Sequence, residues 1–520
     1  MPHLGPRVVR RGAAFLATSI ALSLPLTAGA TQPWPPSTPP RVDLGGDPAP
    51  VPPPHASPEP ASLPAPAEMP VPAPAPASAA KDEAPALVRT AAPPAASAFA
   101  LYGSRDGQLY ARTAGDGLVL LPTARLELDA RAISTDEQNA SGSSTKIGLA
   151  RLAVAGWLWR AVYFDASADF AHGPSLRHAD NYLAVAPWAD RAILQVGQFD
   201  APFTLENRTA DRYLDFGDRG AAIGGFAIPR NKAEGAMVHG TNGDRNFYYS
   251  AGVFDGAGPG ATTANGQVDV MARGWIAPFS FRDPEGLRDV TVGGSLWTGN
   301  RSFDAAGSSF DAQRTSAGYE VMDRTVWTMV GTPRTLELRQ DGRVAAVALE
   351  LNAPFAHRFG ARFEGIWKRQ SLAVVDVGGA RPARTGALTQ SGFATYLEVW
   401  GWVVGDDRLL GAPAAPGLEL PLRLHDFPAH RPASGLMLAA RIDFVDQDVA
   451  VDSGASGLGI ASLGNTKLTA MPLGASYWYS RRARVLLSYV LNHLDGSAPY
   501  VAGLDASIEH EVLLRTALAL

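Results

Sequence analysis

The chain has 520 residues and a formal net charge of −5, and 46% of its residues are hydrophobic whereas only 18% are charged. It contains no cysteine, which excludes disulfide bridges, thiol catalysis and thiolate metal sites. No block of basic residues is present and lysines are few, so the sequence lacks the electrostatic footprint of a nucleic-acid-binding protein. No cofactor or metal motif was found, and none is predicted.

The first 30 residues have the pattern of a secretory signal peptide. Arginines precede an apolar run from Ala13 to Leu26, and a small-residue cleavage site ends at Ala30. The apolar run is too short to span a bilayer as a helix. We therefore expect residues 1–30 to be removed during export; a retained N-terminal anchor is the alternative.

Residues 31–98 hold half of the chain's 42 prolines, interleaved with alanine. Proline lacks the backbone N–H that helices and sheets need, so this composition predicts a disordered, semi-rigid and extended tether. The segment is either a periplasmic spacer that reaches the peptidoglycan or a tail without a partner. The composition alone does not choose between them.

Residues 99–520 contain repeated stretches in which apolar and polar side chains alternate. A strand between lipid and a water-filled lumen has this pattern, because successive side chains point to opposite faces. Beyond residue 98 no apolar run is long enough for a membrane helix. Alternation is clearest in residues 162–170, 358–368, 436–444, 484–492 and 512–520. In residues 358–368, for example, Phe359, Phe363 and Trp367 alternate with Arg362 and Glu364.

The length of this region favours one transmembrane barrel over a soluble β-sandwich, which also alternates but usually has about 100 residues. At roughly 25 residues for each strand and turn, the region accommodates about sixteen antiparallel strands. Aromatic residues near expected strand ends would form an interfacial girdle: Trp157, Trp159, Tyr477, Trp478 and Tyr479.

The run from Ile193 to Glu206, ILQVGQFDAPFTLE, resembles the most recognisable motif of the phosphate-selective porin O and P family. Other segments resemble the family in the same order along the chain. They are Arg151–Gly156, Asp169–Phe170, Asn246–Gly256, Tyr396–Asp407, Gly435–Asp443, Leu468–Asn492 and the closing strand from His510. The resemblance covers about residues 101–520.

This resemblance implies a sixteen-stranded outer-membrane porin of a Gram-negative bacterium, trimeric, with loops folded inward to narrow the lumen. Its partners would be outer-membrane lipid, the barrel assembly machinery and small anionic or general hydrophilic solutes. Two departures from the family matter. The chain ends in Leu520 rather than an aromatic residue, and beyond residue 100 its lysines are Lys146, Lys232, Lys368 and Lys467, so arginine must supply most positive charge.

The resemblance places the constriction in the loop after Phe203. The basic residues between Glu206 and Lys232 are therefore the candidates for the constriction: Arg208, Arg212, Arg219, Arg230 and Lys232. Guanidinium groups bind phosphate and carboxylate in a bidentate manner. Neighbouring acidic residues leave a second interpretation open, in which ion pairs only stiffen the loop. A weaker candidate group follows at Arg324, Arg334, Arg339 and Arg343, which could face the lumen or the outside.

Two other functions compete with a passive channel. A barrel enzyme is disfavoured, because neither a Gly-x-Ser-x-Gly nor a His-Glu-x-x-His motif occurs. A plugged structural barrel, which anchors the outer membrane to the cell wall through the tether, would explain the proline-rich segment better than a porin does. Single-channel recording separates the channel from the anchor.

Overall fold

The computed structural model describes residues 101–519 except for several stretches: 106–107, 114–115, 137–140, 172–178, 229–230, 243, 257–266, 281–285, 304–309, 311–312, 317–319, 323–324, 327–335, 379–381, 411–433, 454–463 and 496–506. The predicted signal peptide and tether lie outside the described residues. In the part that is described, no helix is both long and apolar enough to cross a membrane.

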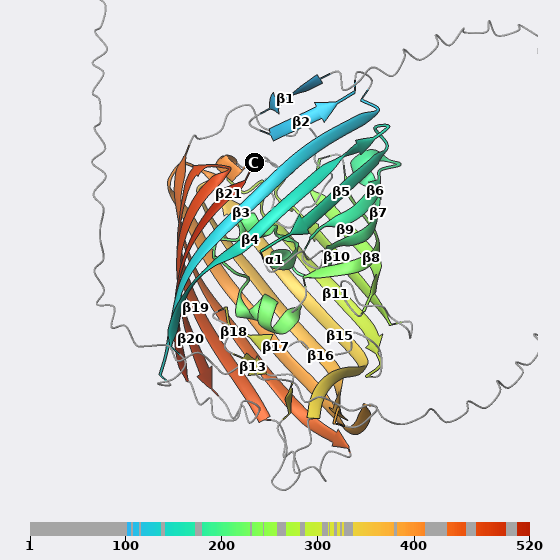
Figure 1. Ribbon diagram of the computed structural model, residues 1–520, viewed down its shortest axis with the longest axis vertical. Helices are drawn as coiled ribbons and strands as arrows, with labels where there is room; N and C mark the ends of the chain where they lie inside the picture. Colours follow the sequence, from blue (N-terminus) through green and yellow to red (C-terminus); the bar gives the residue numbers. More distant parts are fainter. Residues whose placement is uncertain are drawn as a thin grey trace, which may run out of the picture. The chain divides into compact units, whose positions relative to one another are not determined.

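Sixteen antiparallel strands form a closed barrel (Figure 1). Each strand pairs with the next, and β21 pairs with β3 from Glu509↔Thr135 to Ala519↔Arg125, which closes the sheet. The predicted fold and strand number are confirmed. In chain order the barrel strands are β3 (Leu118–Thr135), β4 (Gly142–Leu158), β5 (Val162–Asp169), β6 (Asn181–Val185), β7 (Ile193–Asp200), β8 (Lys232–Thr241), β9 (Phe247–Asp255), β10 (Val268–Ile276), β11 (Thr291–Arg301), β15 (Leu336–Phe355), β16 (Phe359–Asp376), β17 (Ala383–Val404), β18 (Gly435–Ser453), β19 (Gly464–Ser480), β20 (Ala483–Asp495) and β21 (Ile508–Ala519).

Five further strands lie outside this ring of sixteen. β1 (Leu101–Arg105) and β2 (Gln108–Arg112) form a hairpin that pairs with the start of β3, beside the end of β21. β14 (Thr325–Val326) pairs with β15, whereas β12 (Gln313–Arg314) and β13 (Glu320–Met322) pair with each other. A short 3-10 helix, η1 (Ala189–Arg191), precedes β7, and another, η4 (Asp407–Leu410), follows β17.

The two ends of the barrel differ in their connections. One end, called here the turn end, carries short turns such as residues 159–161, 356–358 and 481–482, together with the start of β3 and the end of β21. The other, called here the loop end, carries the connections 201–231 and 302–335. The turn end also carries one longer connection, 405–434, between β17 and β18.

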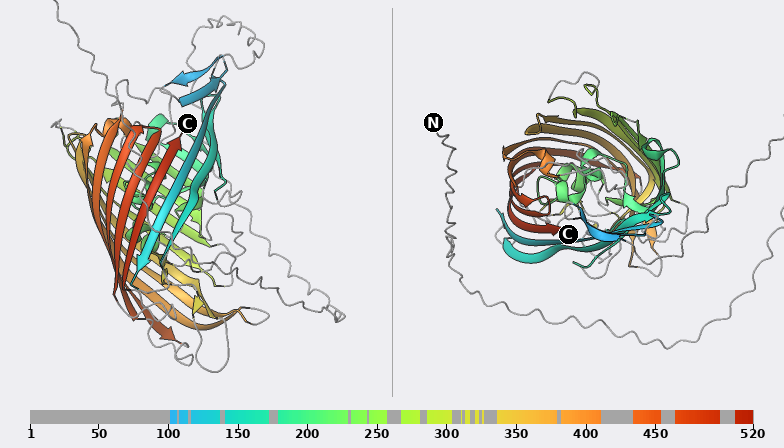
Figure 2. Two further views of the ribbon diagram at one scale, coloured as in Figure 1. Left: turned by 60° about the vertical axis from the view of Figure 1, so that its left-hand side comes forward. Right: turned by 90° about the horizontal axis from the view of Figure 1, so that it is seen from above.

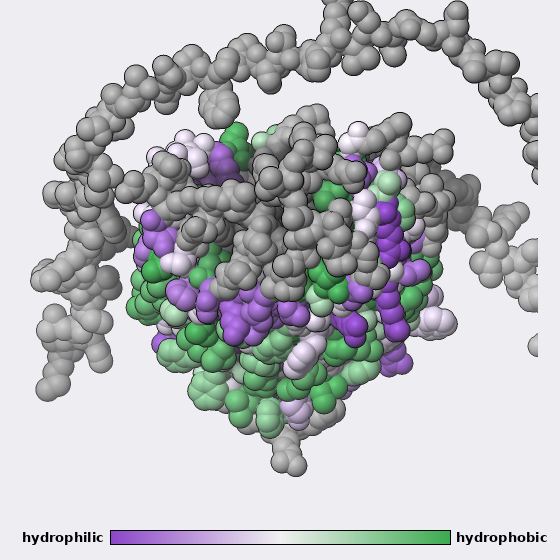
Figure 3. Space-filling view, turned by 90° about the horizontal axis from the view of Figure 1, so that it is seen from below, coloured by the Kyte–Doolittle hydropathy of each residue, from purple (hydrophilic) through white to green (hydrophobic). Residues whose placement is uncertain are grey.

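Alternate side chains point outward and inward, as the sequence predicts. On β16, Phe359, Phe363 and Trp367 are 56%, 37% and 49% exposed, whereas Glu364 and Lys368 on the inner face are buried. Hydrophobic residues make up much of the outer edge seen from the loop end (Figure 3). This apolar outer surface, set against a polar interior, is what lipid on one side and water on the other require.

The predicted aromatic girdle is only partly correct. Trp159, Tyr477 and Tyr479 are exposed near the turn end, 75%, 46% and 73% respectively. Trp157 instead packs edge-on against Tyr163, whose ring centroid lies 5.2 Å away, and Trp478 is buried on the inner face. Consecutive residues of a strand face opposite sides, so these runs of aromatic residues cannot all reach the lipid.

Candidate functional site: a constriction loop and its aperture

The connection between β7 and β8, residues 201–231, folds into the lumen and is called here the constriction loop. Figure 2, in its view from above, shows the helical turns of this loop inside the ring of strands. They are α1 (Leu205–Arg208), the 3-10 turn η2 (Asp211–Tyr213) and the π-helical turn η3 (Ala221–Ala227). The inward-folded loop predicted after Phe203 is thus present.

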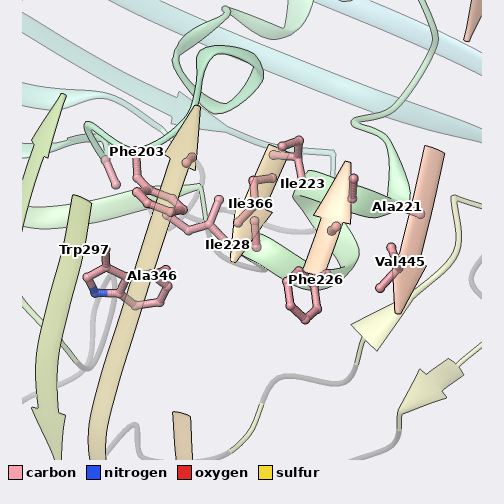
Figure 4. Close-up of a cluster of buried hydrophobic side chains, with 14 of the residues drawn as sticks. Phe203, Ala221, Ile223, Phe226, Ile228, Trp297, Ala346, Ile366 and Val445 are labelled. Atoms are coloured by element: carbon pink, nitrogen blue, oxygen red, sulfur yellow. The ribbon is translucent and has the colours of Figure 1, made fainter. Parts of the chain in front are cut away.

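Apolar contacts hold the start of the loop and the turn η3 against the inner wall. Phe203 packs edge-on against Trp297 of β11, with ring centroids 5.8 Å apart. Ile223 and Phe226 of η3 are at most 1% exposed and lie in the same buried cluster as Ile366 of β16 (Figure 4). Burial of such side chains stabilises the packed loop by roughly 1.5–3 kcal/mol each. This part of the lumen is therefore filled with side chains.

A carboxylate of the wall anchors α1. The backbone N–H groups of Leu205 and Glu206 donate to the carboxylate oxygens of Glu364, at 3.0 and 2.7 Å. The hydroxyl of Tyr396 on β17 donates to Glu364 at 2.7 Å. The first N–H groups of a helix have no partner within the helix, so an acceptor placed there fixes the position of the turn.

Ion pairs attach the loop to the same part of the wall, the strands β16 to β18. Arg441 of β18 makes a bidentate contact with Glu206, at 2.8 and 3.1 Å, and also binds Asp443 at 2.6 Å. Arg362 bridges Asp215 of the loop and Glu398 of β17, the latter at 2.7 Å. Arg441 is buried and the Arg362 side chain is only 13% exposed, so loss of either would leave carboxylates without their partner.

A second set of ion pairs attaches the loop to the seam between β21 and β3. Arg515 binds both carboxylate oxygens of Asp129, at 2.7 and 2.8 Å, and reaches Asp218 of the loop at 3.5 Å. Arg131 binds Asp218 at 2.5 Å and Glu511 at 2.9 Å. The loop is thus tied to the wall on both of its sides.

Between these attachments, partly exposed side chains line the described part of the lumen. On the wall of β16–β18, Glu364, Glu398 and Asp443 are at most 3% exposed. Opposite η2, in contrast, Arg125 of β3 and Arg151 of β4 are only partly buried. The aperture is defined here as Arg125 and Arg151 on the wall with Asp211, Arg212 and Tyr213 on the loop, all of them partly exposed.

Charges act across this aperture. Asp211 binds Arg219 at 2.7 Å. Burial raises the pKa of Asp211, but the positive charges of Arg219, Arg125 and Arg151, in that order, together lower it by more than burial raises it. The pKa of Asp211 therefore lies well below its usual range. The guanidinium of Arg125 is also within electrostatic range of Arg151 and Arg212. Asp211 is therefore ionised, with arginines on both sides of it.

The five candidate residues of the constriction lie in different environments. Arg208 is 1% exposed and donates to the carbonyl of Asp200. Arg219 binds Asp211 and donates to the carbonyl of Thr209 at 3.0 Å, which closes the end of α1. Lys232, the first residue of β8, is buried between Asp180 and Asp200, at 2.6 and 2.8 Å. Arg212 is at the aperture, over the ring of Tyr213 at 4.5 Å, and Arg230 lies outside the described residues.

The second arginine-rich stretch does not line the aperture where it is described. Arg339 donates to the carbonyl of Phe303 at 3.1 Å, and Arg343 faces outward from β15. Arg324 and Arg334 are outside the described residues. Sequence reasoning missed the wall arginines Arg125 and Arg151. Their signal was available, because Arg125 alternates with apolar residues in Arg125–Arg131 (RLELDAR), and Arg151 begins a motif used above.

Comparison with known proteins identifies the family. The sequence model described as "Phosphate-selective porin O and P" matches residues 123–508. The chain belongs to the phosphate-selective porin O and P family. A search of the curated proteins found no match.

Solved structures with the same kind of barrel were also found. OmpT of Vibrio cholerae, folded in vitro, is 13% identical, with 78% of this chain and 98% of that chain covered and a TM-score of 0.44. The anion-selective porin from Comamonas acidovorans is 11% identical, with 78% and 100% covered and a TM-score of 0.42. The outer membrane channel DcaP of Acinetobacter baumannii is 11% identical, with 78% and 98% covered and a TM-score of 0.44.

Membership of the phosphate-selective porin O and P family agrees with the closed barrel and its inward loop. The family and the fold point to an outer-membrane channel and not to an enzyme.

Proposed function

We propose that the chain is a passive outer-membrane porin that prefers small anions, and that the aperture formed by Arg125, Arg151 and η2 is its selective point. The observation that carries this proposal is the placement of the partly exposed arginines. Arg125 and Arg151 lie on the wall opposite η2, and Arg212 lies on η2 itself, so three partly exposed arginines face one another there.

The partly exposed guanidinium groups at the aperture support an anion preference. Four partly exposed arginines lie at or next to it: Arg125, Arg151, Arg212 and Arg219. The acidic groups beside them are Asp165, Asp180 and Asp211, together with buried Glu127, which pairs with Arg125 at 2.8 Å. A narrow passage with a low-dielectric wall strengthens electrostatic fields, so guanidinium groups exposed there attract anions even though the chain is negative overall. Arginine suits bidentate contact with phosphate or carboxylate, and the aperture does not choose between these solutes.

The proposal is tested by the double substitution R125Q/R151Q in planar bilayers. Glutamine keeps a polar side chain of similar length and removes both charges. We expect discrete conductance steps to persist and the chloride-over-potassium permeability ratio in a salt gradient to fall severalfold. The control R160Q/R288Q removes two exposed charges at the turn end, away from the aperture, and should leave the ratio unchanged.

Two outcomes would count against the proposal. An unchanged reversal potential in R125Q/R151Q would remove the aperture from selectivity. Absence of conductance steps in properly folded protein would favour the plugged anchor instead. Recording with and without added phosphate then shows whether phosphate is preferred over chloride.

The remaining assignments are proposals of the same kind. We propose that residues 1–30 are a signal peptide, that residues 31–98 are a periplasmic tether, and that the porin assembles as a homotrimer in the outer membrane of a Gram-negative bacterium. Outer-membrane barrels have short periplasmic turns, so the turn end is the proposed periplasmic end of this barrel. β3 begins at that end, which supports a periplasmic tether. Support for the trimer comes from family resemblance. Native mass spectrometry of detergent-solubilised protein measures both the mature mass and the oligomeric state.

A further inference from the structure

A ring of polar side chains marks the edge of the lipid-facing surface at the loop end. On several strands, the described outward positions change from apolar to polar toward the loop end. On β16, for example, outward Phe363 and Trp367 are followed by Arg369, and on neighbouring β15, outward Leu349 and Val347 are followed by Arg343. Trp367 packs against Phe393 of β17 with tilted rings whose centroids are 5.0 Å apart, next to this level on the side of the barrel's middle. Aromatic residues gather at such interfaces, so both arginines are at headgroup depth.

Arg343 and Arg369 are close neighbours on the outer face. Ala345 is the strand partner of Arg369, and Arg343 is two residues from Ala345 on the same face. Arg343 is the last residue of an irregularity in the register of β15, between Gln340 and Val344, so the two side chains lie on adjacent strands next to a β-bulge. Arg343 stands opposite Asn300 of β11, which is also exposed. The two guanidinium groups therefore share one patch of surface.

This patch differs from the rest of the ring in lacking internal compensation. Elsewhere at this level, Asp446 has Lys467 at 3.8 Å and the amide of Asn465 at 2.8 Å. Arg343 and Arg369 are exposed, and neither has an ion pair or hydrogen bond to another described residue. Adjacent like charges repel each other, and charge at the edge of hydrocarbon is costly unless an opposite charge meets it.

We infer that Arg343 and Arg369 bind phosphate groups of lipid in the outer leaflet, and that the Trp367–Phe393 pair packs against the same lipid's acyl chains. Guanidinium groups bind phosphate through paired, charge-assisted hydrogen bonds. A glycolipid that carries phosphate groups above its acyl chains has the charge and depth that the patch requires. This interaction surface is on the outside of the barrel, so it stands or falls independently of the channel's selectivity.

The test uses the full barrel in phosphatidylcholine nanodiscs that contain a small fraction of bisphosphorylated lipid A. Native mass spectrometry measures how much lipid A the barrel retains as its fraction is titrated. Each basic residue near a charged membrane surface contributes about a fivefold increase in affinity. We expect R343Q and R369Q each to weaken retention about fivefold, and R343Q/R369Q about 25-fold.

The control R160Q/R288Q removes the same charge at the turn end and should retain lipid A like the natural sequence. Equal migration of unheated and heated samples in gel electrophoresis would reveal misfolding, and the two single variants then carry the test. Equal retention by R343Q/R369Q and the natural sequence would overturn the proposal. So would equal retention of dephosphorylated lipid A, or complete displacement of lipid A by inorganic phosphate, which would indicate a site for free anions.

Discussion

Substitution of Glu364 by alanine tests whether a single wall carboxylate fixes the constriction loop. Three donors lose their acceptor in this variant: the backbone N–H groups of Leu205 and Glu206, and the hydroxyl of Tyr396. A buried donor left without a partner costs about 1–3 kcal/mol. Only the two backbone donors join the loop to the wall, so their sum is about 2–6 kcal/mol, and about 3 kcal/mol applies because the shortened side chain leaves room for water.

A loss of about 3 kcal/mol raises the population of detached loop on the order of 100-fold, since about 1.4 kcal/mol corresponds to a factor of ten. The chain has no cysteine, so one introduced thiol reports on the loop without background. Thr209, just after α1, is 4% exposed, and Thr209→Cys is therefore protected while the loop is attached. We expect E364A to accelerate maleimide labelling of this thiol about 100-fold.

Tyr396→Phe provides a graded control, because it removes one of the three donors and leaves the two backbone contacts. It should accelerate labelling only about fivefold, for a loss of about 1 kcal/mol. The strand ladder does not involve these contacts, so both variants should keep the electrophoretic behaviour of a folded barrel. Equal labelling rates in E364A and the unsubstituted background would refute the role of Glu364 as an anchor.

Two further predictions concern stability. Lys232→Met leaves buried Asp200 without its ion-pair partner, so we expect the free energy of unfolding to fall by about 3–5 kcal/mol. The reversal potential should change little. A shifted reversal potential at unchanged stability would instead make Lys232 a pore residue. Hydrogen bonds from the Ser507 hydroxyl and the Ile508 N–H lower the pKa of Asp136, which joins the first and last strands of the barrel. The ionised form therefore stabilises the barrel above its unfolded pKa near 3.8, and this stabilisation is lost as the pH falls through the lower folded pKa. Asp136→Asn should lower the thermal midpoint at pH 7, and this effect should shrink steadily as the pH is lowered below 3.8. An effect that does not change with pH would contradict this.

The strands were predictable because their periodicity is a local property of the sequence. Alternation in residues 358–368 reflects lipid on one side and lumen on the other, and this alternation is written into every second residue. The same parity rule could have corrected part of the aromatic girdle, because Tyr477 and Trp478 are consecutive and cannot lie on the same face. Trp157 and Trp159 have the same parity, but they still differ: Trp157 faces inward and packs on Tyr163, whereas Trp159 lies in the turn beyond the end of β4.

The selective part of the lumen was less predictable, since it depends on which wall the constriction loop covers. Lys232 and Arg208 look alike as basic loop residues in the sequence, but one is enclosed by two aspartates and the other by α1 and the wall. Their burial follows from contacts with β7, β16 and β17 that lie far away in the chain. For the same reason Arg125 stands out only after the loop is placed opposite β3.

The central claim is that an open, positively charged aperture remains between η2 and the wall of β3 and β4. The most direct test is the zero-current potential of single channels held in a tenfold gradient of potassium chloride. The account predicts stepwise currents whose reversal potential has the sign of chloride permeation, and a shift toward zero when Arg125 and Arg151 are both replaced by glutamine. Cation-selective currents in the natural sequence, or a folded barrel that passes no current, would contradict it.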